Sequence, residues 1–217
     1  MRGAVWVAYG DRTKQLAAKS LAGFREHNRV SAAVLDDVEK LTGRVNKAGV
    51  QVPEGLSTDQ LAHFAKTTVN LWSPFDLTLM IDADTTIKGS LEIGFSLLRR
   101  GWDLVVVPSS PPGPAQVPNV GRRVLWHLNR NERDYTISNL GLFAHVMYNS
   151  GILFFAKTPR IEALFDCWRR EWLRFKDRDQ GALLRALDKH PVKMFLLGSP
   201  FNSIDGEVVE HNFGKAR

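Results

Sequence analysis

Two carboxylates separated by one residue follow an apolar run. They belong to the segment Leu79-Met80-Ile81-Asp82-Ala83-Asp84-Thr85. Because alternate side chains of an extended segment share a face, Asp82 and Asp84 point the same way and together can hold one hard cation. Ligands of open α/β sheets gather at the carboxyl ends of strands, which is where this pair lies. An Asp-x-Asp also starts many ordinary loops, so other segments must support the metal interpretation.

Three later segments carry further groups that could bind a ligand. They are Tyr148-Asn149-Ser150-Gly151-Ile152-Leu153, Asp179-Gln180 followed by Leu183 and Leu184, and His211-Asn212-Phe213-Gly214-Lys215. Each also has an ordinary structural interpretation. Asn149-Ser150-Gly151 could form a turn before a strand, Asp179 could cap a helix, and His211 could be an exposed histidine in a polar tail.

Together with Lys66 and Ser73-Pro74-Phe75-Asp76, these segments resemble in order and spacing the donor-binding segments of GT-A-fold glycosyltransferases. The group they resemble most is the glycogenin-like and bacterial galactosyltransferase group, which is family 8-like. The resemblance runs from Val5 to the end of the chain and is best at these motifs. It implies an α/β protein with one GT-A-type, Rossmann-like domain over residues 1–217, whose mostly parallel central sheet is covered by helices. Residues 1–108 would form the nucleotide-binding half, and residues 109–217 the half for donor sugar and acceptor.

The resemblance implies a metal and phosphate site. The metal ligands would be Asp82, Asp84 and His211. The cofactor would be Mn²⁺ or Mg²⁺, and an imidazole among carboxylates suits Mn²⁺ better than Ca²⁺. Lys215, with Arg217 as a secondary candidate, would assist at the donor's phosphates. Gly214 would allow the backbone to approach the diphosphate closely.

The remaining roles that the resemblance implies concern the nucleoside and the sugar. The donor-binding residues would be Tyr9, Asp11 and Lys66 at the nucleoside or its phosphates, and Asn149 and Gly151 beside the sugar. Among the catalytic residues, Gln180 would lie beneath the anomeric carbon and Asp179 would hold sugar hydroxyls. Transfer would retain anomeric configuration without a dedicated protein nucleophile.

The resemblance therefore predicts a hexosyltransferase-type enzyme that uses a nucleotide diphosphate sugar, with UDP-sugar favoured, and an acceptor that the sequence leaves unknown. The family's terminal element usually continues into Pro-Trp and further helices, whereas this sequence stops at Arg217. We therefore expect either a minimal enzyme or one completed by a second subunit, for example in a homo-oligomer. A nucleotide-sugar-binding protein without turnover is the non-enzymatic alternative.

A phosphatase of the haloacid dehalogenase type is the second enzymatic alternative, because Ile81-Asp82-Ala83-Asp84-Thr85 also resembles that family's nucleophile motif. Asp82 would attack phosphorus and Asp84 would act as acid or base. That family needs a downstream acidic pair, and Leu196-Leu197-Gly198-Ser199-Pro200 has none. Its nucleophile also normally lies on the first strand of the chain.

The elements that must position these residues alternate along the chain. Apolar runs predict strands at Val5–Ala8, Val30–Leu35, Leu77–Ile81, Leu104–Val107, Ile152–Phe155 and Val192–Leu197. Helical spacing predicts helices after Asp11, from the Ser57 and Gln60 capping box to about Leu71, and over Ile87–Leu98, Ile161–Phe175 and Gln180–Leu187. The tail Glu210–Arg217 has no core pattern. Such alternation indicates a mostly parallel sheet covered by helices.

Composition restricts the class of protein. The formal charge of +6 favours an anionic partner, here the donor's phosphates or an anionic acceptor, while no nucleic-acid motif accompanies the basic residues. The single cysteine, Cys167, excludes disulfides within the chain. No apolar run reaches the length of a membrane span, so we expect a cytoplasmic protein. The Pro-rich stretch Ser109–Gly121 and the arginines after it, Arg122, Arg123, Arg130 and Arg133, are expected to border the acceptor.

Overall fold

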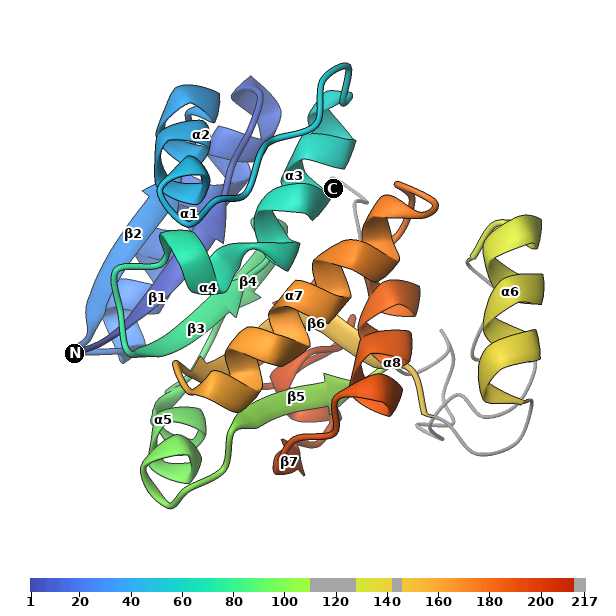
Figure 1. Cartoon of the computed structure of the whole chain (residues 1–217). Helices are drawn as coiled ribbons and strands as arrows, with labels where there is room; N and C mark the ends of the chain where they lie inside the picture. Colours follow the sequence, from blue (N-terminus) through green and yellow to red (C-terminus); the bar gives the residue numbers. More distant parts are fainter. Residues whose placement is uncertain (110–127, 142–145, 213–217) are drawn as a thin grey trace.

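The computed structural model of the chain describes residues 1–109, 128–141 and 146–212 (Figure 1). The strands are β1 (Arg2–Val7), β2 (Ser31–Leu35), β3 (Leu77–Ile81), β4 (Thr85–Ile87), β5 (Leu104–Pro108), β6 (Tyr148–Ala156), β7 (Met194–Leu196) and β8 (Val209–His211). The helices are α1 (Asp11–His27), α2 (Val38–Asn46), α3 (Thr58–Thr67), α4 (Val69–Trp72), α5 (Glu92–Arg99), α6 (Arg130–Leu140), α7 (Pro159–Leu173) and α8 (Asp179–Lys189). A short 3-10 turn covers Ser199–Phe201.

Six of these strands form the central sheet, in the order β2-β1-β3-β6-β5-β7. The pairs β1 with β2, β1 with β3, and β5 with β7 are parallel, whereas β6 is antiparallel to both β3 and β5. The predicted α/β architecture with a mostly parallel central sheet is therefore confirmed. The reversed direction of β6 means that its first residues lie at the same edge as the last residues of β3.

Both faces of the sheet are buried, because consecutive residues of a strand point to opposite sides. Along β1, Val5 and Val7 belong to one hydrophobic cluster, while Ala4 and Trp6 belong to the other. The first cluster lies under α2, α3, α4, α7 and α8, and the second lies under α1 and α5. Helices thus cover the sheet on two sides (Figure 1).

Helix boundaries follow local signals where these are strong. The predicted capping box is present at the start of α3, where the Ser57 hydroxyl accepts from the Gln60 backbone and the Gln60 side chain accepts from the Ser57 N–H. The helix predicted to run to Leu71 is interrupted at Thr68, whose hydroxyl bonds to the Phe64 carbonyl. Such back-bonding competes with the regular ladder.

The prediction of a helix from Ile87 is wrong in its first turn. Residues Thr85–Ile87 form β4 and pair with β8 in a separate two-stranded sheet, and α5 begins only at Glu92. The tail prediction needs a matching correction, because Val209–His211 is a strand with Val209 fully buried. Pairing across a long sequence separation decides both segments, and no local pattern reports it.

Buried charges hold α6 against α8. The Arg185 guanidinium lies 3.0 Å from Glu132 Oε1 and 2.9 Å from Glu171 Oε2, and it donates to Thr136 Oγ1 at 2.8 Å. Lys189 Nζ lies 2.5 Å from the second Glu171 oxygen. We call Arg185, Glu132, Glu171 and Lys189 the ion network. Its Arg185 and Glu132 side chains are each only 1% exposed.

In the described part of the chain, no helix combines the length and the apolar character that crossing a membrane requires. The Pro-rich stretch, apart from Ser109, lies outside the described residues together with Arg122 and Arg123. Of the other two arginines in the predicted cluster, Arg130 is exposed and pairs loosely with Asp134, while Arg133 donates to the Leu128 carbonyl. Whether this region borders an acceptor stays a prediction.

Candidate active site

The candidate site lies at the edge of the sheet where β3 ends and β6 begins. The last residue of β3, Ile81, pairs with Ile152, and the Asp82 N–H then donates to the Gly151 carbonyl at 2.8 Å. Asn149, Ser150 and Gly151 are consequently buried residues of β6. The interpretation of these three residues as a turn before a strand is wrong, because β6 starts at Tyr148.

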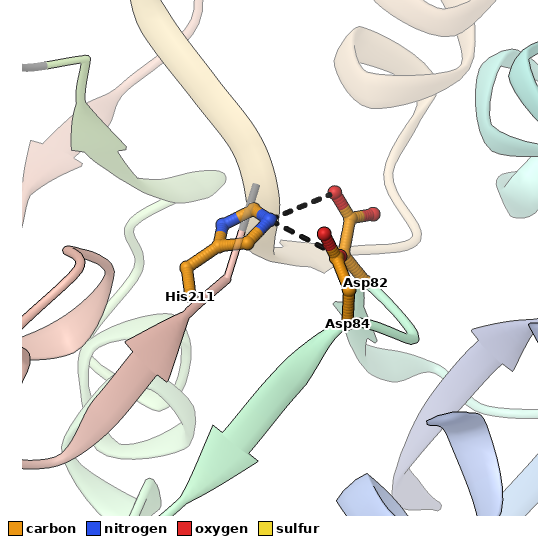
Figure 2. A group of neighbouring side chains, drawn as sticks. All are labelled: Asp82, Asp84 and His211. Carbon is orange, nitrogen blue, oxygen red and sulfur yellow. Dashed lines mark ion pairs between the residues drawn. The ribbon is translucent and has the colours of Figure 1, made fainter. Parts of the chain in front are cut away.

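Asp82, Asp84 and His211 form a group that could hold a metal ion. One ligand atom from each of the three residues lies within 4.8 Å of the others. His211 Nε2 is 3.2 Å from Asp84 Oδ1 and 3.8 Å from Asp82 Oδ2 (Figure 2). Two carboxylates and an imidazole nitrogen suit a divalent ion of intermediate hardness. The donor set thus fits a divalent cation, and of the two ions that the resemblance implies it suits Mn²⁺ better than Mg²⁺.

Strand pairing brings His211 to the two carboxylates. In the β4–β8 ribbon Thr85 is paired with His211. This pairing brings the His211 imidazole to the carboxylate of Asp84, the residue before Thr85 (Figure 2). The Asn212 N–H then donates to the Asp84 carbonyl at 3.0 Å. His211 is only 4% exposed, which rules out the alternative of a solvent-exposed histidine.

Gly151 makes room for the imidazole. A Cβ atom at this position would lie 2.5 Å from His211 Cε1 and 2.8 Å from its Nδ1, closer than carbon and nitrogen atoms can approach. Any side chain at Gly151 would therefore displace the ring. Gly151, which the resemblance placed beside the donor sugar, therefore also limits where the His211 ring can lie.

Lys66 of α3 neutralises part of the acidic charge. Its Nζ atom is 2.5 Å from Asp82 Oδ1. Burial by itself would lower the pKa of the Lys66 ammonium, but the charges of Asp82 and Asp179 outweigh it and raise that pKa above its ordinary value. Lys66 is therefore a permanent cation beside the candidate metal ligands.

Asp179 lies beside this lysine as the first residue of α8. His63 Nδ1 is 3.0 Å from Asp179 Oδ1, while Oδ2 is buried and has no hydrogen-bond partner among the described residues. Burial would raise the pKa of Asp179, but the Lys66 charge and hydrogen bonds from His63 and Ser150 hold it well below its usual range. Asp179 is thus a carboxylate with one oxygen held and one still able to accept.

Asp179 does not cap α8. The N-cap residue is Arg178, and no side chain makes a capping hydrogen bond there. The capping interpretation is wrong, because the Asp179 side chain turns toward His63 and not toward the helix end. Gln180 is half-buried at the second helical position.

The residues predicted to contact the nucleoside follow β1. Tyr9 is buried, and its hydroxyl has no hydrogen-bond partner within the described ranges. Burial, followed by the nearby charges of Asp37 and Asp36, raises the pKa of this hydroxyl. Asp11 is exposed at the start of α1. Gly214, Lys215 and Arg217 lie outside the described residues, so their roles stay predictions.

Sequence reasoning missed His63, which the structure brings to Asp179. One signal for it was available: His63 precedes Lys66 by three residues on a helix with a clear capping box, and residues at that spacing share a helix face. Ser150 was quoted as part of a motif, but it was given no role.

Comparisons with known proteins were made at the level of sequence and of structure. No protein-family profile and no curated protein sequence matches the chain. Solved structures do match. Mouse xyloside xylosyltransferase 1 in its apo form is 12% identical with a TM-score of 0.58, over 93% of this chain and 87% of that one. The fold is GT-A.

Two further GT-A structures support this assignment. The galactosyltransferase LgtC, solved with donor and acceptor sugar analogues, is 15% identical with a TM-score of 0.58, and the match covers 99% of this chain and 88% of that one. A glycosyltransferase involved in glycosylation of the major capsid of PBCV-1 is 10% identical with a TM-score of 0.60, over 99% and 94% of the two chains. At these identities the likeness establishes the GT-A fold, as the sequence motifs predicted, and the activity requires a separate argument.

Proposed function

We propose that this protein is a glycosyltransferase that moves a sugar from a nucleoside diphosphate donor to an acceptor and depends on a divalent metal. One observation carries the proposal: the ligand atoms of Asp82, Asp84 and His211 lie within 4.8 Å of one another where β3 ends. That edge is where ligands bind in open α/β sheets, and the fold is GT-A. UDP is the favoured nucleotide only through the resemblance in sequence motifs.

The proposed metal site explains why two carboxylates gather where an anionic donor must bind. Asp82 and Asp84 would repel a diphosphate unless they held a divalent cation together with His211. A Mn²⁺ or Mg²⁺ ion held there would supply positive charge for the diphosphate that leaves when the sugar is transferred. Lys66, held beside Asp82, adds a further positive charge.

The sugar lies, in this proposal, against Asp179 and Gln180 at the start of α8. Asp179 Oδ2, which has no partner among the described residues, accepts a hydrogen bond from a sugar hydroxyl, while His63 Nδ1 lies 3.0 Å from the other oxygen. Transfer breaks the bond from the anomeric carbon to the diphosphate and forms one to the acceptor oxygen. The acceptor would attack on the face from which the diphosphate leaves, and its proton would pass to the departing diphosphate. Configuration would then be retained without a protein nucleophile.

The nucleoside half is assigned to Tyr9 and Asp11, which follow the neighbouring strand β1. The buried Tyr9 hydroxyl offers one donor and one acceptor without a partner among the described residues. LgtC, a neighbour in fold, was solved with donor and acceptor sugar analogues, which supports a nucleotide-sugar donor for this chain.

The test measures nucleoside diphosphate released from a panel of nucleotide sugars with Mn²⁺ or with chelator. We compare the wild type with Asp84→Asn, and with Asp188→Asn as control, because Asp188 is an exposed acid on α8. Release should require metal and fall by about 100-fold or more in Asp84→Asn, since metal electrostatics contribute several kcal/mol and about 1.4 kcal/mol corresponds to tenfold. The control should match the wild type.

Other outcomes would select other functions. Equal release with chelator would remove the metal from the proposal. Metal-dependent UDP binding without release from any donor would favour a nucleotide-sugar-binding protein. Hydrolysis of phosphate monoesters alone would favour the phosphatase, although β7 is followed by Leu197 and Gly198 and not by an acidic pair.

A further inference from the structure

The positions of the three candidate metal ligands do not determine which nitrogen of the His211 imidazole carries the proton. A neutral imidazole has one nitrogen with a proton and one with a lone pair, and only the latter can bind a metal. The hydrogen bond made by the other nitrogen decides which is which. In this structure Nε2 faces Asp82 and Asp84, so Nδ1 must carry the proton if the site is to hold a cation.

Asn202 is the residue that contacts the other ring nitrogen, Nδ1. Its Oδ1 atom lies 2.6 Å from His211 Nδ1, and both side chains are buried. An amide oxygen can only accept, so this contact requires the proton on Nδ1. A neutral His211 then offers the lone pair of Nε2 on the side of the two carboxylates, where a cation would lie. We propose that Asn202 is a positioning residue of the metal site, which fixes the tautomer and the ring orientation of His211. This inference rests on the proposed metal-dependent function.

The backbone around Asn202 is held independently of any metal. The Asn202 N–H donates to the Ser199 carbonyl at 3.0 Å, and the His211 N–H donates to the Ser203 carbonyl at 2.8 Å. Asn202 therefore lies next to the residue that anchors β8 at His211. Because Gly151 leaves no space on its side of the ring, the imidazole is confined between β6 and the Asn202 amide.

The other end of the Asn202 amide supports the assignment. Its Nδ2 atom is buried and has no hydrogen-bond partner among residues 1–109, 128–141 and 146–212. A buried N–H without a partner is unfavourable, so the local contacts of Nδ2 do not set the amide orientation, and the contact of Oδ1 with His211 Nδ1 is the one that bears on it. A reversed amide would donate to Nδ1 and move the ring proton to Nε2, where it would block the metal. The observed orientation is the one that serves His211.

Mn²⁺ affinity, measured from the electron paramagnetic resonance of the free ion, tests the role of Asn202. Asn202→Leu keeps the volume but removes the acceptor, and it should weaken binding by about 10- to 100-fold, as is usual when the partner of a metal-bound histidine is lost. Asn202→Asp restores an acceptor and should bind close to wild-type affinity. Ser203→Ala, which alters the adjacent side chain but keeps its carbonyl, is the control.

The outcomes separate the two proposals. Wild-type affinity in Asn202→Leu overturns the role of Asn202 while leaving the metal site intact. An equal loss in Asn202→Asp also overturns it, because an acceptor at this position would then not be what His211 needs. A wild-type protein that binds no Mn²⁺ overturns the metal site and this inference together.

A second measurement does not depend on any variant folding. Two-bond ¹H–¹⁵N spectra of the wild type loaded with diamagnetic Zn²⁺ report which imidazole nitrogen carries the proton. For His211 we expect the proton on Nδ1 and the metal on Nε2. A proton on Nε2 would overturn the proposal.

Discussion

Helix α8 contributes to two clusters of buried charge that are built on different principles. Asp179, at its first residue, belongs to the site cluster, which we define as Asp82, Asp84, Asp179, Lys66 and His211. Arg185, further along the same helix, is the centre of the ion network. Both clusters remove charged groups from water, which is unfavourable unless those groups are paired.

The two clusters differ in charge balance and in where their atoms point. In the ion network two carboxylates meet two cations, and Arg185 lies between Glu132 and Glu171. In the site cluster three carboxylates accompany one lysine, and two of them face the same imidazole nitrogen. The network is balanced in charge, although Glu132 Oε2 is buried without a hydrogen-bond partner among the described residues. The site cluster has an excess of negative charge at one point, which is the feature of a site that binds a cation.

The largest effect should come from breaking the ion network. Arg185→Met leaves Glu132 and Glu171 buried without their shared partner, and removal of one partner from a buried pair costs about 3 to 5 kcal/mol of stability. Urea unfolding measures this loss. The control is Arg170→Met, whose side chain is 61% exposed and pairs with Asp166 on the surface, so about 0.5 kcal/mol or less is expected.

If the ion network and the site cluster are separate, Arg185→Met should lower the free energy of unfolding without changing metal binding. Arg185→Met should keep wild-type Mn²⁺ affinity at temperatures where it is folded, because Arg185 contacts none of the candidate ligands in the described structure. If the variant unfolds at the same urea concentration as the wild type, the network does not anchor α6 and the distinction fails.

A smaller effect, on donor affinity and not on stability alone, should come from replacing His63 beside Asp179. His63→Leu removes the group 3.0 Å from Asp179 Oδ1 and leaves that carboxylate less well oriented for a sugar hydroxyl. A hydrogen bond to a charged group contributes about 1.5 to 3 kcal/mol, so donor affinity in the presence of Mn²⁺ should fall by about tenfold or more. Calorimetric titration with a nucleotide sugar measures it.

Affinity for Mn²⁺ alone should change little in His63→Leu. His27→Leu is the matched control, because His27 is an exposed histidine at the end of α1. Unchanged donor affinity in His63→Leu would make His63 a spectator, and an equal fall in Mn²⁺ affinity would assign it to the metal and not to the sugar.

The sequence predicted the elements whose signals are local. Leu77–Ile81 is observed as a strand with the predicted bounds, and the capping box formed by Ser57 and Gln60 is present at α3. Continuous apolar runs and capping residues act within a few positions, so a single sequence reveals them. Asp82 and Asp84 were identified for the same reason, because they follow such a run directly.

Contacts between distant segments account for what the sequence did not reveal. The pairing of Thr85 with His211 places the imidazole, and it also turns the start of the predicted helix at Ile87 into a strand. Neither segment has the length or the alternation that predicts a strand. Asn202 has no pattern at all in the sequence, because its function depends on lying 2.6 Å from a ring nine residues later. The sequence alone could suggest such a residue only after His211 was placed.

The smallest effect concerns the two carboxylates that share Arg185, whose pKa values are displaced in opposite directions. Burial raises the pKa of Glu132, and Arg185 offsets this only in part. For Glu171 burial also acts upward, but hydrogen bonds from Lys189 and Arg185 outweigh it and lower the pKa. A raised folded-state pKa contributes stability below the unfolded pKa, and this stability is lost as pH rises. A lowered folded-state pKa contributes stability above the unfolded pKa, and this stability is lost as pH falls.

Relative to wild type, Glu132→Gln should therefore become more stable as pH rises from about 4.5, the ordinary value for this side chain. The deficit of Glu171→Gln should instead shrink as pH falls below that value. Urea unfolding of both variants from about pH 3 to about pH 7 measures the two slopes. Slopes of the same sign would show that the two pKa values are not displaced in opposite directions.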